Sequence, residues 1–376
     1  MTEKQKRYDS AYLRMALEWA KLSHCQRKKV GALIVKDRMI ISDGYNGCPS
    51  GFENECEDAE GNTKWYVLHA EANAIKKSLI NVNGSTLYAT LEPCNHYGKT
   101  PPCTNLIKKK KIKKVVYGIN DIDPRTSKTA KKFFKNKKIK VKEGILSKKL
   151  NKFYKSYFYI KKNKLPYVIG KIASSKDNFI KSKKNKMLTN NFSQDLSHLL
   201  RYRSHAILIS YKTLNSDNPK LNCRLNSLEQ HSPVRVVLDK NLNLKKNTFL
   251  INTAKKIPTY IFYNKKKLKK INFLKKKGVT LIHLKLKNNN FILINFFKKL
   301  YNKNIFYLLV EGGLNLTQNF LENKAFNEFF HFKSTKKLKK NGNIKLFNFE
   351  KKAKNIFKNI EEVKTYTGDD KVLRYY

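Results

Sequence analysis

The chain has 376 residues, 40% of them apolar, and a formal net charge of +52. This length and apolar content favour two folded domains and argue against an intrinsically disordered chain. The six cysteines are too few for a disulfide framework, the first residues are polar, and no run of about 18 apolar residues is present, so we expect a soluble, cytoplasmic protein with reduced thiols.

The positive charge comes from lysines that are spread over nearly the whole chain, whereas arginines are few. Lysine and asparagine have A-rich codons, so a drift in genomic base composition explains this pattern without selection for binding. A nucleic-acid-binding protein would concentrate its basic residues on one face or in one motif. We therefore expect no specific nucleic-acid partner and no membrane partner.

The first part of the chain alternates between helical and strand-like patterns. Apolar residues at helical spacing predict a helix over residues 10–22. The other predicted elements are strands over 31–35, 38–42, 85–90 and 114–119 and helices over 70–79 and 104–110. Strands separated by helices are typical of a layered α/β domain, which we place at residues 1–146.

A lysine-rich helical linker over residues 147–165 precedes Pro166, after which the strand-like pattern returns. Strands are predicted over 167–173, 205–211, 234–239, 259–263, 279–284 and 305–310. Several of them are almost continuously apolar, as buried parallel strands are. We therefore predict a second α/β domain over residues 166–376.

Four residues in the first domain have the chemistry of a catalytic zinc site. His69, Cys94 and Cys103 can fill three positions of a tetrahedral zinc ion and leave the fourth for water. Glu71, two residues from His69, is the candidate that moves the protons of that water. This set predicts a hydrolytic deaminase of a nucleobase-like ring. A purely structural zinc site and a chance grouping are the alternatives.

The second metal motif also carries a resemblance to a known family. Residues 90–103 read Thr-Leu-Glu-Pro-Cys-Asn-His-Tyr-Gly-Lys-Thr-Pro-Pro-Cys, which resembles the bifunctional riboflavin-biosynthesis deaminase–reductases almost residue for residue. The resemblance implies a three-layer cytidine-deaminase-like domain followed by a dihydrofolate-reductase-like domain. It further implies zinc-dependent deamination of 2,5-diamino-6-ribosylamino-4(3H)-pyrimidinone 5′-phosphate, and then NADPH-dependent reduction of the ribosyl to a ribityl side chain.

The resemblance continues through most of the second domain, in the segments 171–177, 199–208 and 310–313. It implies NADPH contacts at Ala173, Thr213, Asp217 and Gly313. It implies substrate contacts at Arg201, Leu221, Arg224 and Glu311, with Arg201 a candidate for the substrate phosphate. The expected partners are thus a small phosphoribosyl pyrimidine and a second copy of the chain in a homo-oligomer.

The chain departs from this family in two places. Residues 12–75 look instead like deoxycytidylate deaminases, and Asn46 stands where the riboflavin family has a histidine. Asn46 could contact sugar or base, or it could serve only as a turn residue. In the second domain Met187 stands where the family usually has tryptophan, which puts cofactor affinity in doubt.

Three further cysteines, Cys25, Cys48 and Cys56, lie in the segment that resembles deoxycytidylate deaminases. We expect small buried thiols here, with a second structural zinc site as the alternative. The competing functions are a deoxycytidylate deaminase with a vestigial or independent second half, and an RNA-binding or RNA-editing protein. The second domain shows no recognisable RNA-binding motif.

Overall fold

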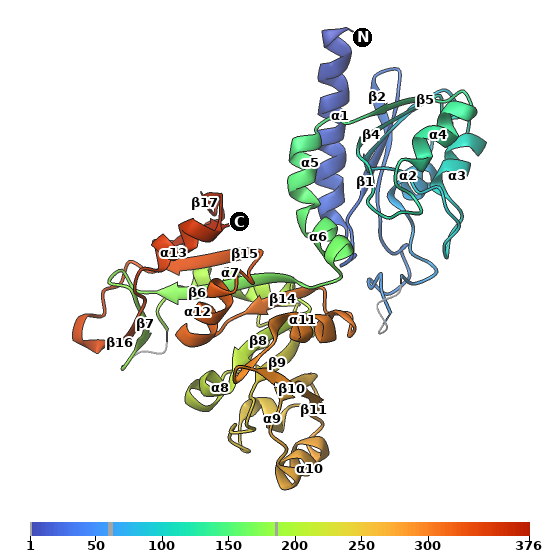
Figure 1. Cartoon of the computed structure of the whole chain (residues 1–376). Coiled ribbons are helices and arrows are strands. Elements are labelled where there is room, and N and C mark those ends of the chain that lie inside the picture. The colour runs from blue at the N-terminus through green and yellow to red at the C-terminus, as the bar shows by residue number, and fades with distance from the viewer. Residues whose placement is uncertain (1, 59–62, 185–186) are drawn as a thin grey trace. The chain divides into compact units, whose positions relative to one another are not determined.

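The computed structural model describes residues 2–58, 63–184 and 187–376. The chain divides into two compact units, Met1–Lys164 and Leu165–Tyr376, each with its own sheet and apolar core (Figure 1). Among the described residues, none of the helices combines the length and the apolar character that crossing a membrane would require.

The first unit contains a five-stranded sheet in the order β2-β1-β3-β4-β5. Strands β3, β4 and β5 are parallel, and β1 runs antiparallel to both of its neighbours. The strands are β1 (Gly31–Lys36), β2 (Met39–Tyr45), β3 (Thr86–Leu91), β4 (Lys114–Ile119) and β5 (Lys140–Glu143). The helices are α1 (Glu3–Leu22), α2 (Ala70–Lys77), α3 (Cys103–Lys109), α4 (Thr129–Asn136), α5 (Ser147–Phe153) and α6 (Lys155–Asn163).

Helices cover both faces of this sheet, because side chains of a strand point alternately to its two sides. Leu33 and Val35 of β1 pack with the side chains of α1 on one face. Ala32 and Ile34 belong to the core on the other face, which includes residues of α2, α3 and α4. The predicted layered α/β architecture is confirmed for this unit, and every strand predicted in it is present.

Two helices of the first unit differ from the prediction. Helix α1 starts at Glu3 rather than at residue 10, because the hydroxyl of Thr2 accepts a hydrogen bond from the backbone N–H of Gln5 and caps the helix. The predicted linker helix is two helices, separated at Tyr154. The buried Tyr154 hydroxyl donates to the carbonyl of Lys29, which fixes this residue against the start of β1.

The second unit is built on a nine-stranded sheet in the order β11-β10-β9-β8-β14-β6-β15-β18-β17. Its strands are parallel from β11 to β15, and β18 is antiparallel to both β15 and β17. The sheet strands are β6 (Tyr167–Ser174), β8 (Ala206–Ser210), β9 (Val234–Leu238), β10 (Thr259–Tyr263), β11 (Thr280–His283), β14 (Tyr307–Val310), β15 (Glu328–Lys333), β17 (Ile360–Glu362) and β18 (Lys371–Tyr375).

Two small antiparallel two-stranded sheets lie outside this sheet, one formed by β7 (Phe179–Ser182) and β16 (Gly342–Lys345) and one by β12 (Leu286–Lys287) and β13 (Asn290–Phe291). The helices are α7 (Asn191–Tyr202), α8 (Tyr211–Asp217), α9 (Phe249–Asn252), α10 (Leu268–Lys276), α11 (Leu293–Tyr301), α12 (Leu314–Glu322), α13 (Phe349–Ile356) and the 3-10 helix η1 (Lys339–Asn341).

The large sheet is covered on both faces. Residues of α11, α12 and α13 contribute to one core cluster, and residues of α7, α8, α9 and α10 contribute to the other. All six predicted strands of this unit are present, and three further strands of the large sheet, β15, β17 and β18, were not predicted. Parallel strands buried under helices on both faces explain the continuous apolar runs in the sequence.

Candidate functional sites

Three elements of the first unit bring the predicted metal ligands together. His69 is the N-cap residue of α2, Cys94 follows β3, and Cys103 is the first residue of α3. Helix α2 lies close against β2 because Gly44 has no side chain. A Cβ atom at Gly44 would come within 2.5 Å of the backbone nitrogen of Ala74. The position of His69 therefore depends on this close contact between helix and strand.

The eight residues between Cys94 and Cys103 form a loop that returns to its starting point. The backbone N–H of Cys103 donates to the sulfur of Cys94 at 3.3 Å, and the N–H of Thr104 donates to the Cys94 carbonyl at 3.2 Å. The loop thereby places the two thiols side by side in space. Along the sequence, they are separated by more residues than most pairs of zinc-binding cysteines.

The distances between the three ligand atoms fit a tetrahedral zinc ion. The Nδ1 atom of His69 lies 3.3 Å from the sulfur of Cys94 and 3.4 Å from the sulfur of Cys103, and all three atoms lie within 4.8 Å of one another. Zinc bonds of about 2.0–2.3 Å in tetrahedral geometry separate ligand atoms by roughly 3.5–3.8 Å. Within the described part of the chain, this is the one group of such side chains with metal-ligand spacing.

Glu71 lies beside these ligands, in the first turn of α2. Its side chain is buried, and the Cys103 sulfur lies 3.6 Å from its Oε2 atom. Burial and the negative charge of Cys94 raise the pKa of Glu71 above its usual value. Hydrogen bonds from Cys103 and His69 lower the pKa of Cys94, which favours the thiolate that a metal binds.

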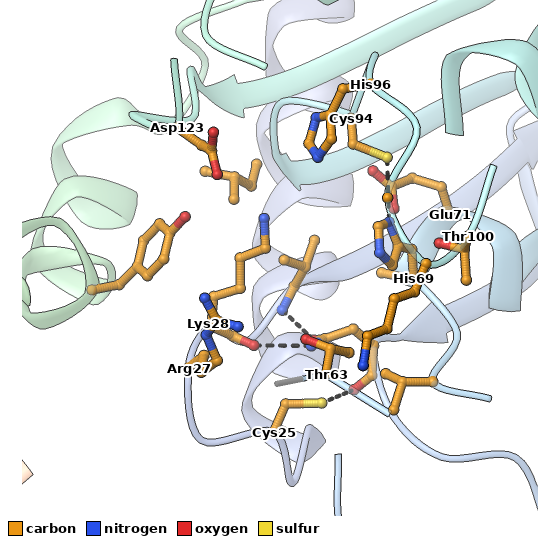
Figure 2. A pocket seen from close by; sticks show the side chains of 18 of the residues that line it. Cys25, Arg27, Lys28, Thr63, His69, Glu71, Cys94, His96, Thr100 and Asp123 are labelled. Atoms are coloured by element: carbon orange, nitrogen blue, oxygen red, sulfur yellow. Dashed lines mark hydrogen bonds between the residues drawn. The ribbon is translucent and has the colours of Figure 1, made fainter. Parts of the chain in front are cut away.

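His69, Glu71 and Cys94 line a cavity of about 280 Å³ (Figure 2). Asn46 also lines it, but both ends of its side-chain amide are bound to backbone. Its oxygen accepts from the N–H of Val30 at 2.6 Å, and its nitrogen donates to the carbonyl of Lys28 at 2.9 Å. Asn46 thus holds the segment before β1 in place, which accounts for this residue without a ligand.

The structure corrects the expectation of free thiols at two of the other cysteines. Cys25 and Cys56 are buried and joined by a disulfide bond, and Cys48 is a free, half-buried thiol. The disulfide ties the segment after α1 to the long segment between β2 and α2. The carboxylate of Glu57 reinforces this connection by accepting hydrogen bonds from the backbone N–H groups of Gln26 and Arg27.

In the second unit the structure brings two predicted substrate residues into direct contact. The guanidinium group of Arg201, on α7, donates two hydrogen bonds of 2.8 Å to the carboxylate of Glu311, at the end of β14. Arg201 also donates to the carbonyl of Asn222 at 3.2 Å. Lys171 of β6 lies near enough for its charge to act on Glu311, and burial lowers the pKa of Lys171. No role was predicted for Lys171.

The other two predicted substrate residues, Leu221 and Arg224, lie in the segment around Asn222, whose carbonyl binds Arg201. Arg224 is exposed, and its guanidinium group donates to the side chain of Asn222 at 3.0 Å. The side chain of Leu221 is buried in the apolar core, so only its backbone remains for a polar ligand, at a positive φ of 52°. The Arg224 backbone N–H donates to Nδ1 of the buried His198.

Of the four predicted NADPH contacts, two lie together. The backbone N–H of Gly313, the N-cap residue of α12, donates to the hydroxyl of Thr213 at 3.3 Å. Asp217 is exposed at the end of α8 and pairs with Lys181. Ala173 lies on β6, beside Phe332 of β15. Thr213, Asp217 and Gly313 thus follow the carboxyl ends of the parallel strands β8 and β14, where ligands bind in sheets of this kind.

Comparison with known proteins agrees with both units. The family model of the cytidine and deoxycytidylate deaminase zinc-binding region matches residues 6–119, and that of the RibD C-terminal domain matches residues 166–338. The chain is 32% identical to the riboflavin biosynthesis protein RibD of Aquifex aeolicus over 330 residues, which cover 86% of each chain. It is also 32% identical to RibD of Actinobacillus pleuropneumoniae over 300 residues, 79% of this chain and 75% of that protein.

Solved structures show the same two-part fold. One is a protein of Thermotoga maritima described as a diaminohydroxyphosphoribosylaminopyrimidine deaminase/5-amino-6-(5-phosphoribosylamino)uracil reductase. It matches with a TM-score of 0.75 at 27% identity, and the match covers 98% of this chain and 99% of that protein. RibD of Acinetobacter baumannii has a TM-score of 0.77 at 23% identity, with 99% of both chains covered. The predicted fold class, with a cytidine-deaminase-like and a dihydrofolate-reductase-like domain, is confirmed. The chain belongs to the RibD family of bifunctional deaminase–reductases of riboflavin biosynthesis.

Proposed function

We propose that this chain catalyses two successive steps of riboflavin biosynthesis. Residues 1–146 would deaminate 2,5-diamino-6-ribosylamino-4(3H)-pyrimidinone 5′-phosphate, and residues 166–376 would reduce the ribosyl group of the product to ribityl with NADPH. The observation that carries this proposal is the combination of the His69, Cys94 and Cys103 cluster with the alignment to a RibD protein over 86% of both chains.

In the deaminase step, His69, Cys94 and Cys103 would hold the zinc ion. A bound zinc ion supplies hydroxide from water at neutral pH. Glu71 would carry one proton from that water to the ring nitrogen, and a second proton, from the hydroxyl group formed on the ring carbon, to the departing amine. Its raised pKa suits a group that both takes up and gives back a proton.

In the reductase step, Ala173, Thr213, Asp217 and Gly313 would contact NADPH. A bound NADPH supplies the hydride. On the substrate side, Glu311 holds the guanidinium group of Arg201 in one orientation.

Among the predicted substrate residues and their neighbours, the charge of Arg201 is already paired with Glu311. The remaining positive side chains are Lys171 and the exposed Arg224. We therefore propose Arg224, in place of the expected Arg201, as the residue that would bind the substrate phosphate, while backbone groups near Leu221 would contact the rest of the substrate.

The test is a paired assay of the purified full chain with the diaminopyrimidinone phosphoribosyl substrate and with deoxycytidylate. We expect ammonia release from the first substrate and little from the second. The match of residues 6–119 to the cytidine and deoxycytidylate deaminase zinc-binding region makes deoxycytidylate the sharpest competing substrate. Turnover of deoxycytidylate alone would overturn the proposal.

A further inference from the structure

One side of the deaminase cavity is lined by positively charged side chains from separate parts of the first unit. Arg27 and Lys28 lie in the segment between α1 and β1, Arg125 lies after β4, and Lys161 lies on α6. In the close view of the cavity, Arg27 and Lys28 lie across from Glu71 (Figure 2). We call the side lined by these four cations the basic end; Lys64 and Lys99 line the cavity as well.

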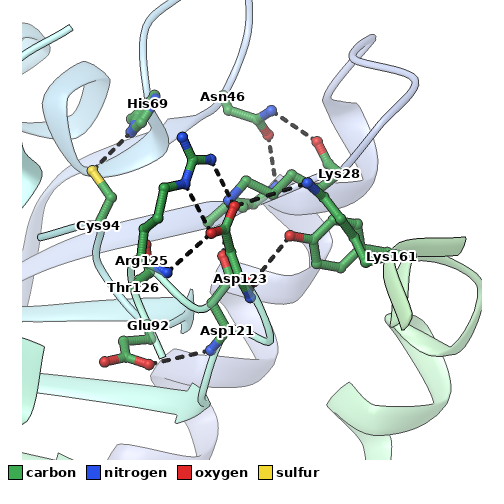
Figure 3. A network of polar contacts seen from close by, with 12 residues as sticks. Lys28, Asn46, His69, Glu92, Cys94, Asp121, Asp123, Arg125, Thr126 and Lys161 are labelled. Atoms are coloured by element: carbon green, nitrogen blue, oxygen red, sulfur yellow. Dashed lines mark hydrogen bonds and ion pairs between the residues drawn. The ribbon is translucent and has the colours of Figure 1, made fainter. Parts of the chain in front are cut away.

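Two carboxylates lie among these cations (Figure 3). The Nζ atom of Lys28 lies 3.0 Å from Asp121. Arg125 binds Asp123 through two contacts, of 3.0 and 2.7 Å. The Nζ atom of Lys161 lies 3.8 Å from the same Asp123 carboxylate, which Arg125 already occupies. Among Lys28, Arg125 and Lys161, Lys161 therefore has the longest ion pair.

The ion pairs at the basic end are not one to one. Lys28, Arg125 and Lys161 share only two carboxylates, those of Asp121 and Asp123. Burial lowers the pKa of Lys161. The positive charges of neighbouring side chains, that of Arg27 first among them, lower this pKa further. Like charges that repel one another in a partly buried site are stabilised by an anion between them.

A phosphate monoester has the properties that this end requires. It carries about −1.5 to −2 charges at pH 7, and its oxygens accept charge-assisted hydrogen bonds from ammonium and guanidinium groups. Two of the predicted zinc ligands, His69 and Cys94, line the same cavity as the basic side chains, so one small molecule can contact both groups. A ring at Glu71 and a phosphate at Lys161 would together use the whole cavity.

We propose that Lys28, Arg125 and Lys161 form the subsite that binds the 5′-phosphate of the deaminase substrate. This inference rests on the proposed function and adds the residues that select a phosphorylated substrate. It also assigns a binding role to α6, a helix of the predicted linker. Lys161 is the specificity-determining residue of the three, because its ammonium group is the least engaged by carboxylates.

The experiment measures KM and kcat for deamination of the phosphorylated substrate and of its dephosphorylated riboside. In Lys161→Gln, we expect KM for the phosphorylated substrate to rise roughly tenfold or more, the size of effect of a lost charged hydrogen bond. KM for the riboside should stay unchanged, and Lys161→Arg should restore the wild-type KM. The matched control is Lys162→Gln, which removes an exposed lysine from the same helix.

An unchanged KM for the phosphorylated substrate in Lys161→Gln, with normal zinc content, would overturn the subsite. Failure of the wild-type protein to deaminate either compound would instead overturn the proposed function. The subsite is then decided by equilibrium binding of inorganic phosphate to the full chain. We expect Lys161→Gln to bind one phosphate fewer per chain than wild type, and equal binding would refute the proposal.

Discussion

Arg201 and Glu311 form a bidentate ion pair, with both nitrogen–oxygen distances at 2.8 Å and both side chains largely buried. The pair joins α7 to the end of β14 in the reductase unit. Burial alone would raise the pKa of Glu311, but the charge and hydrogen bonds of Arg201 lower it to about 2. A buried pair of this kind stabilises the fold only while both partners are charged.

The first prediction concerns the stability of this pair. Glu311→Gln leaves Arg201 and Lys171 without their carboxylate, and we expect a loss of about 3–5 kcal/mol in the free energy of unfolding of the second unit. Both tryptophans, Trp19 and Trp65, lie in the first unit. The loss should therefore appear in the circular dichroism transition and leave the tryptophan fluorescence transition unchanged. A shift of the fluorescence transition alone would contradict it.

The same pair predicts a pH dependence. The pKa of Glu311 is lower in the folded chain than its ordinary value of 4.5, so its stabilising contribution is complete above that value. The contribution is lost as the pH falls from 4.5 towards 2. The difference in unfolding free energy between wild type and Glu311→Gln should shrink over this range. A constant difference would show that Glu311 is not the titrating group.

A third prediction separates proton transfer from metal binding. Glu71→Gln keeps the size of the side chain but removes the group that carries protons. We expect deaminase kcat to fall by about 10²–10⁴-fold, with zinc content and reductase activity unchanged. Metal analysis of the purified variant is the control. A fall in zinc content in proportion to activity would identify Glu71 as a ligand instead.

The fourth prediction concerns the disulfide between Cys25 and Cys56. It closes a loop with a sequence separation of 31 residues, and its loss should destabilise the first unit by about 3–4 kcal/mol. Tryptophan fluorescence should report this loss in Cys25→Ser and in Cys56→Ser, whereas Cys48→Ser should have little effect.

Thiol titration under denaturing conditions provides a direct count for the same disulfide. It should find the four free cysteines before reduction and all six after it. Six reactive thiols in the unreduced protein would contradict the bond.

The sequence predicted the metal cluster because zinc chemistry restricts its ligands to a few residue types, and His69, Cys94 and Cys103 lie in short motifs. It predicted six of the seven parallel strands of the large sheet, because parallel strands buried on both faces leave continuous apolar runs. It did not predict β15, β17 and β18, because charged or polar residues interrupt the apolar pattern in each of them.

Other features depend on contacts between distant segments. The disulfide between Cys25 and Cys56 forms because the segment between β2 and α2 folds back against the segment after α1. The spacing of the cysteines in the sequence does not reveal this path. Lys161 was not singled out because it is one of 80 lysines and arginines, and only the fold places it beside Asp123. That Lys161 lines the deaminase cavity can therefore be seen only in the tertiary structure.

The most direct test of the two-step activity is the mass of the product formed by the full chain from the diaminopyrimidinone substrate with NADPH. We predict a single final product in which an oxygen has replaced the amino group and the ribosyl group has gained two hydrogen atoms. Without NADPH, the product should be the deaminated compound alone. A product that is deaminated but never reduced, even with NADPH in excess, would contradict the account of the second unit.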